Sequence, residues 1–117
     1  MSDHLTVRFV PLGAAPEAVT VVLCGSDLAL PSRARQINTQ SGDSLSRAAA
    51  AADFKGRKRQ TLEILAPQKI DIQRLLAIGV GASTEMTETD WVNLGGLIFA
   101  QISARKAPTA SLIAEWP

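Results

Sequence analysis

Four cations lie within five residues in the turn Lys55-Gly56-Arg57-Lys58-Arg59. A turn of this kind could contact the phosphates of a nucleic acid or an acidic partner. No aromatic side chain is interleaved with the cations, so stacking on bases is not expected. The net charge of the whole chain is only +1, so a solvated basic loop is the competing interpretation. The candidate anion- or DNA-contacting residues are therefore Lys55, Arg57, Lys58 and Arg59.

A second candidate site is the short glycine segment Gly79-Val-Gly81-Ala-Ser83, which follows an apolar run and precedes a capped helix. Backbone amides at such a place could cradle a phosphate. The spacing matches neither the dinucleotide fingerprint nor the P-loop, and no lysine follows. We therefore favour a tight connection in which the glycines allow close packing, and expect nucleotide binding to be absent or weak.

Most other chemistry is excluded by residue counts. The chain has one histidine, His4, beside the N-terminus, one cysteine, Cys24, and no tyrosine. A tetrahedral zinc site needs about four Cys or His ligands, and a nucleophile-histidine site needs a histidine on a rigid element. We therefore predict no catalytic, metal-binding or cofactor-binding residue. The carboxylates are scattered through turns and helix starts, where they cap or form turns: Asp3, Glu17, Asp27, Asp43, Asp53, Asp71 and Asp90.

The strands that could position these residues are indicated by apolar patterning. Two nearly continuous apolar runs, Val19–Cys24 and Ile72–Val80, are typical of strands covered on both faces in an α/β sheet. Alternation of apolar and polar residues predicts half-buried strands. These lie at Leu5–Val10 and Gln60–Ala66, and Ala110–Ala114 is predicted to be a last strand.

Two helices are predicted between the first strands and the basic turn. The segment Asp43–Phe54 carries an alanine run of high helix propensity, and Ser41 or Asp43 could cap it. Its apolar stripe begins at Leu45. A shorter helix is predicted over Ser32–Gln40, after Pro31.

A third helix is predicted from Thr87-Glu-Thr-Asp90, which resembles a capping box with Asp in place of Glu, to near Lys106. We expect Trp91 to anchor it in the core. The pair Gly95-Gly96 lowers helix propensity by roughly 1–2 kcal/mol. We expect close contact with a neighbouring element to offset that loss.

The predicted element order is β-β-α(α)-β-β-α-β, an α/β fold with a mixed sheet flanked by helices. A chain of 117 residues with 46% apolar and 20% charged residues is one ordinary globular domain. It has no apolar run of membrane-spanning length and no signal-peptide pattern. The single Cys24 fits a reducing compartment. We expect a soluble, cytoplasmic protein without a membrane partner.

Three stretches together resemble the N-terminal domain of the cytosol, or leucyl, aminopeptidases. They are Ala51-Ala-Asp-Phe-Lys-Gly56 followed by Gln60-Thr-Leu-Glu-Ile-Leu65, Arg74-Leu-Leu-Ala-Ile-Gly-Val-Gly81, and Asp90-Trp-Val-Asn-Leu-Gly-Gly96. The resemblance covers essentially the whole chain, through Ile113. It implies a macro-domain-like fold and a parent enzyme that removes N-terminal amino acids from peptides.

The resemblance also implies what lies elsewhere in such a parent. Two divalent metals, zinc or manganese, a catalytic lysine and arginine, and the signature NTDAEGRL belong to a second domain and have no counterpart here. Residues 1–117 would form the noncatalytic N-terminal domain, without a cofactor of its own. Its partners would be its catalytic domain and sister subunits in a homo-hexamer. Some bacterial members use this domain in DNA binding, for which the turn Lys55–Arg59 is the natural candidate.

Two other interpretations stay open. One is a stand-alone macro-like module that binds ADP-ribose or a related nucleotide, and the other is a small DNA-contacting domain. The chain ends at Glu115-Trp116-Pro117, directly after a predicted strand and without a helix to cover the sheet. We therefore expect the domain to be incomplete at its C-terminus. Self-association is then expected, with Leu112, Ile113 or Trp116 near the contact.

Overall fold

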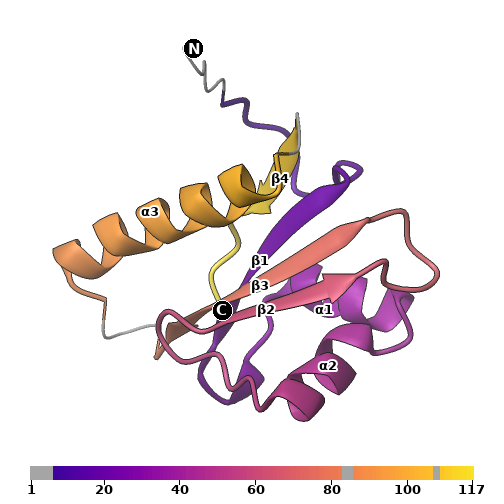
Figure 1. The fold of residues 1–117 in the computed structure, drawn as a ribbon, viewed down its shortest axis with the longest axis horizontal. Coiled ribbons are helices and arrows are strands. Elements are labelled where there is room, and N and C mark those ends of the chain that lie inside the picture. The colour runs from indigo at the N-terminus through magenta and orange to yellow at the C-terminus, as the bar shows by residue number, and fades with distance from the viewer. Residues whose placement is uncertain (1–6, 83–85, 107–108) are drawn as a thin grey trace.

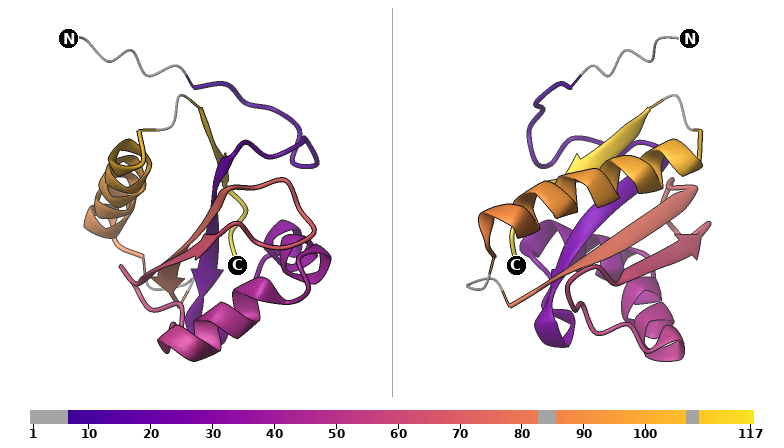
Figure 2. Two further views of the ribbon diagram at one scale, coloured as in Figure 1. Left: turned by 45° about the vertical axis from the view of Figure 1, so that its right-hand side comes forward. Right: turned by 60° about the vertical axis from the view of Figure 1, so that its left-hand side comes forward.

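The computed structural model describes residues 7–82, 86–106 and 109–117. The helices α1 Ser32–Gln40 and α2 Ser44–Ala52 lie against one face of a four-stranded sheet, and α3 Glu88–Ala104 lies on the other face (Figures 1 and 2). A short 3₁₀ turn, Ser26–Leu28, follows the first strand. The elements are β1 Val19–Gly25, α1 Ser32–Gln40, α2 Ser44–Ala52, β2 Thr61–Leu65, β3 Arg74–Gly81, α3 Glu88–Ala104 and β4 Ala110–Ile113.

The sheet is mixed, with strand order β2-β3-β1-β4. β1 runs parallel to both β3 and β4, whereas β2 runs antiparallel to β3. The two apolar runs form the two central strands, and every residue of β1 is buried. The predicted α/β class with a mixed sheet is thus confirmed. The central strands are mainly apolar because helices cover both of their faces.

Each face of the sheet has its own apolar cluster. Val22, Leu45 and Leu75 belong to the cluster under α1 and α2. Val21 and Ile78 belong to the cluster under α3. The second cluster is closed only by partly buried side chains, because α3 has no buried residue. The partly buried residues that pack on it are Leu94, Leu97, Ile98, Ile102, Ala110 and Trp116.

The start of α2 is capped by a residue that the sequence did not indicate. Neither expected cap acts on the helix amides: the Asp43 side chain makes no capping bond, and the Ser41 hydroxyl donates back to carbonyls of α1. Instead, the Asn38 Oδ1 atom accepts from the backbone amides of Leu45 and Ser46 at 3.0 and 3.1 Å. The buried Asn38 thus ties α1 to α2.

The start of α3 has the predicted capping box. The Thr87 hydroxyl accepts from the Asp90 amide, and the Asp90 carboxylate accepts from the Thr87 amide. Two other expectations for α3 are wrong. Trp91 is 52% exposed and stacks on Trp116 with ring centroids 4.7 Å apart. Gly95 and Gly96 approach no neighbouring element, since an added Cβ at either position would meet no atom within 4 Å.

The N-terminal strand prediction is also wrong where the structure describes it. Residues 7–10 have no strand partner, and Phe9 is 97% exposed. The remainder of Leu5–Val10 lies outside the described residues. Alternation marks a strand only when a sheet face is available to cover it, and none of the described elements covers this segment.

The C-terminal segment lies between α1 and α3. The Glu115 carboxylate accepts from the Ser32 hydroxyl and, at 2.6 Å, from the Arg33 amide at the start of α1. These bonds, that of Ser32 first, lower the pKa of Glu115. Trp116 rests on Trp91 of α3. Of the residues expected near a self-association contact, Leu112 is exposed and Ile113 is buried; that contact stays a prediction.

Candidate functional site

The basic turn is held against the sheet by an approach that only glycine permits. An added Cβ on Gly79 would lie 2.1 Å from the Arg57 carbonyl oxygen, and one on Gly56 would lie 2.0 Å from the Gly25 oxygen. Gly56 also has φ +77°, a conformation that side chains disfavour. The turn therefore packs backbone to backbone across the ends of β1 and β3.

The same packing occupies the amides proposed for a phosphate cradle. Gly79 donates its N–H to the Gln60 carbonyl at 2.8 Å, and Gly81 donates to the Gly56 carbonyl at 2.9 Å. Because these donors already have acceptors, they do not face a ligand. The structure thus supports the tight-connection interpretation over the phosphate cradle. Ser83 lies outside the described residues.

Two of the four cations in the turn face carboxylates. Lys55 lies 3.4 Å from Asp53, and Lys58 Nζ donates to Asp90 at 2.9 Å. Arg57 and Arg59 are exposed, and the described part of the chain offers neither an ion pair. The cations available for phosphate contact are therefore fewer than the sequence indicates. DNA contact through the turn stays a prediction that depends on the two arginines.

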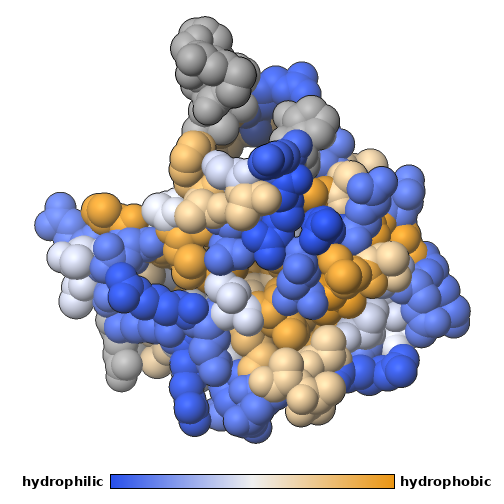
Figure 3. All heavy atoms as spheres, in the orientation of Figure 1, coloured by the Kyte–Doolittle hydropathy of each residue, from blue (hydrophilic) through white to orange (hydrophobic). Residues whose placement is uncertain are grey.

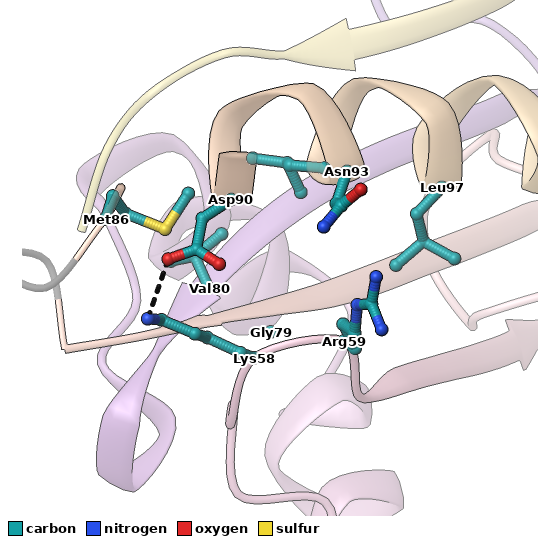
Figure 4. Close-up of a pocket in the computed structure, with 9 residues that line it drawn as sticks. Lys58, Arg59, Gly79, Val80, Met86, Asp90, Asn93 and Leu97 are labelled. Atoms are coloured by element: carbon teal, nitrogen blue, oxygen red, sulfur yellow. Dashed lines mark hydrogen bonds and ion pairs between the residues drawn. The ribbon is translucent and has the colours of Figure 1, made fainter. Parts of the chain in front are cut away.

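A cavity of about 320 Å³ lies between the basic turn and α3. Figure 4 shows Lys58 and Arg59 reaching from the turn toward α3, with Asp90 and Asn93 facing them from the helix. The remaining wall is mainly apolar, formed by Val80, Met86, Leu94 and Leu97 together with Gly79. A pocket with an apolar wall and a few polar groups is the usual form of a small-molecule site, but here one of the cations is already paired with Asp90.

The helix side of this cavity was not predicted as a site. Asn93 and Leu97 face the basic turn across about forty residues of sequence, and no local pattern connects them to it. The capping box at Asp90 was the one usable signal, since it places a carboxylate at the start of α3.

A second ion pair joins the other end of the helix, where Arg105 Nε donates to Glu63 at 2.9 Å. That bond, followed by the bond from Arg74, lowers the pKa of Glu63.

The Asp90 carboxylate is expected to make folding sensitive to acid. The Thr87 amide, first, and the Lys58 ammonium lower its pKa to about 2 from an ordinary 3.8. Because the folded pKa is the lower one, this contribution to stability is present above about pH 4 and is lost as the pH falls toward 2. In the variant Asp90→Asn, the free energy of unfolding measured in urea should therefore change less between pH 5 and pH 2 than in the unsubstituted chain.

The control for this experiment is Asp71→Asn. Asp71 is an exposed loop carboxylate for which the described residues offer no hydrogen bond or ion pair. Its replacement should leave the acid dependence of unfolding close to that of the parent. If the free energy of unfolding of both variants depends on pH as it does in the unsubstituted chain, then Asp90 does not contribute the expected acid sensitivity.

Groups of other kinds do not assemble a reactive centre in the described part of the chain. No three His, Cys, Asp or Glu side chains come together there in a way that could hold a metal ion. Burial raises the pKa of Cys24 to about 12, so this thiol stays protonated and unreactive. No described helix is both long and apolar enough to cross a membrane. His4 lies outside the described residues.

Comparison with known proteins assigns the fold to a family. Residues 21–115 match the N-terminal domain of the cytosol aminopeptidase family. A "Probable cytosol aminopeptidase" from Bradyrhizobium sp. is 40% identical and one from Afipia carboxidovorans 38% identical, each over 117 residues. These alignments cover 100% of this chain but only 23% of each relative.

A solved structure agrees with this assignment. A mutant of tomato leucine aminopeptidase superposes with a TM-score of 0.62 at 17% identity, covering 86% of this chain and 20% of that one. At this identity the likeness shows the fold alone, whereas the match over residues 21–115 spans most of the chain. The chain thus belongs to the cytosol aminopeptidase family and corresponds to its N-terminal domain.

Proposed function

We propose that residues 1–117 are a noncatalytic domain of a longer, metal-dependent aminopeptidase, and that the domain serves subunit assembly. The observation that carries the proposal is the family match over residues 21–115, combined with a chain that spans about a quarter of its relatives' length. The names of those relatives support peptide hydrolysis as the activity of the parent.

The chemistry of the cavity is consistent with a noncatalytic role. Lys58 and Asp90 form an ion pair at its edge, and its other lining groups are mainly apolar or amide. A two-metal hydrolase needs several carboxylate or imidazole ligands around its metals, and the described residues do not cluster in that way. In this proposal the divalent metals, the homo-hexamer contacts and the cleavage chemistry belong to the longer protein. A cytoplasmic location is part of the same proposal, because the relatives are named cytosol aminopeptidases.

The proposal predicts that the purified chain does not hydrolyse peptides. Leucine p-nitroanilide would be assayed with added zinc, manganese or magnesium, and release of nitroaniline should equal that of buffer with the same metal. A leucine aminopeptidase assayed in parallel shows that substrate and metals are competent. Turnover that rises with chain concentration and requires metal would contradict the proposal.

The alternative of a macro-like nucleotide module receives less support. The amides of Gly79 and Gly81 are bonded to the basic turn, and the cation Lys58 is bonded to Asp90. A phosphate group at this edge would have to displace these bonds. We accordingly propose assembly, rather than nucleotide binding, as the role of the domain.

A further inference from the structure

The outer side of α3 carries an apolar stripe that the rest of the described chain leaves uncovered. Val92 is 70% exposed and Phe99 is 54% exposed. Between them lie Gly95 and Gly96, which are exposed and have no atom near a would-be Cβ. The helix turns its other side, with Leu94 and Ile98, to the sheet. Figure 3 shows apolar atoms exposed among polar ones along the visible side of α3.

The order of residues along this stripe is symmetric about its centre. If two copies of α3 cross antiparallel with a two-fold axis between Gly95 and Gly96, then Gly95 of one copy faces Gly96 of the other. Val92 then faces Phe99 of the second copy. Two glycines at the crossing point let the helix backbones approach closely. A surface that is complementary to itself in this way is what a two-fold dimer requires.

Charge is complementary in the same arrangement. Glu88 lies in the first turn of α3 and Lys106 two residues beyond its end, and both are exposed. Antiparallel crossing brings the Glu88 end of one helix to the Lys106 end of the other. It also sets the two helix dipoles antiparallel, which is favourable. Parallel crossing would instead bring together ends of like charge.

From this symmetry we propose that the outer face of α3 is the contact between two copies of the chain. The proposal rests on the assembly role proposed above, and it names the surface that carries it. The occupant is a second copy because the apolar pair and the glycine centre match under one two-fold axis, which also brings the oppositely charged ends of the two helices near each other. An unrelated partner would require no such symmetry in the stripe.

The test is sedimentation of the 117-residue chain over a range of concentrations. The average mass of the unsubstituted 117-residue chain should approach that of two copies as its concentration rises. The single variants Val92→Lys and Phe99→Glu should each weaken association by about tenfold or more, because each buries an unpaired charge. The combined variant should recover association, because each new ammonium faces a new carboxylate across the axis.

Leu65→Lys is the matched control. Leu65 is an exposed apolar residue that belongs to β2 and not to the α3 stripe, and its replacement should leave association unchanged. Circular dichroism should show that every variant is folded, since positions 92 and 99 are exposed. The proposal would be overturned if the unsubstituted chain stayed monomeric or if the combined variant did not regain association. It would also be overturned if Leu65→Lys weakened association as much as the α3 variants.

These outcomes are separate from those that test the proposed function. A chain that is inactive toward leucine p-nitroanilide but stays monomeric overturns the α3 contact alone. Metal-dependent turnover by the chain overturns the noncatalytic assignment, whatever its mass in sedimentation.

Discussion

Replacement of Gly79 by alanine is expected to destabilise the folded chain by about 3 kcal/mol, the upper end of the usual cost of overpacking. The new methyl group would lie 2.1 Å from the Arg57 oxygen and 2.6 Å from the Gly56 carbonyl carbon. Both are backbone atoms, so rotation of a side chain cannot relieve the clash. The turn is also fixed in place, because Arg59 donates to the Gly79 carbonyl and Gly79 donates to that of Gln60.

Urea unfolding followed by circular dichroism measures this loss. Gly96→Ala is the matched control, since it adds the same methyl group where no atom lies within 4 Å. In the middle of α3 this change should stabilise the chain by up to about 1 kcal/mol through helix propensity. Both proteins should be dilute, so that association does not contribute. Equal stability of the two variants would show that the turn does not pack against Gly79 as described.

Replacement of Asn38 by alanine is expected to lower the free energy of unfolding by about 2 kcal/mol, because it leaves a buried donor without an acceptor. The Asn38 Oδ1 atom is the acceptor for the amides of Leu45 and Ser46. The Leu45 amide lies in a buried environment, so water does not replace the lost bond. Both the start of α2 and its attachment to α1 should weaken.

The control at this position is Asn38→Asp, which keeps an oxygen in the place of Oδ1. A negative charge is also favourable at the start of a helix. The variant gives up the 3.4 Å contact from the Asn38 amide nitrogen to the Ser46 hydroxyl, and it places a carboxylate at a buried position, which carries a desolvation cost. The free energy of unfolding, measured in urea, should fall by less than half as much as in Asn38→Ala. Because aspartate keeps both the volume and the oxygen, equal losses in the two variants would mean that acceptance by Oδ1 does not determine the role of Asn38.

The central elements of the fold could be predicted from the sequence because their signals are local. The apolar runs of β1 and β3 require cover on both faces, and the structure places them at the centre of the sheet. The capping box at Thr87 and Asp90 depends on residues three apart, and it forms as expected. The resemblance to the aminopeptidase N-terminal domain, carried by motifs along the whole chain, was confirmed by the match over residues 21–115.

The candidate site was predictable only in part. The basic turn was found from composition, because four cations within five residues stand out in any chain. Its pairing with Asp90 was not, since Lys58 and Asp90 are 32 residues apart. Nor could the sequence show that the glycines of β3 serve the turn rather than a ligand. A glycine permits close approach, but only the tertiary structure shows which group approaches.

The sequence by itself thus determined which segments become central strands and helices, and the family to which they belong. The tertiary structure decided which side chains are covered. Trp91 and Phe9 are large and apolar, yet both are exposed, because burial needs a neighbour that local pattern does not supply. Asn38 caps a helix that it does not belong to, and Gly95 and Gly96 face open space. Periodicity and capping act within one or two turns of chain, whereas burial and close approach depend on elements brought together by folding.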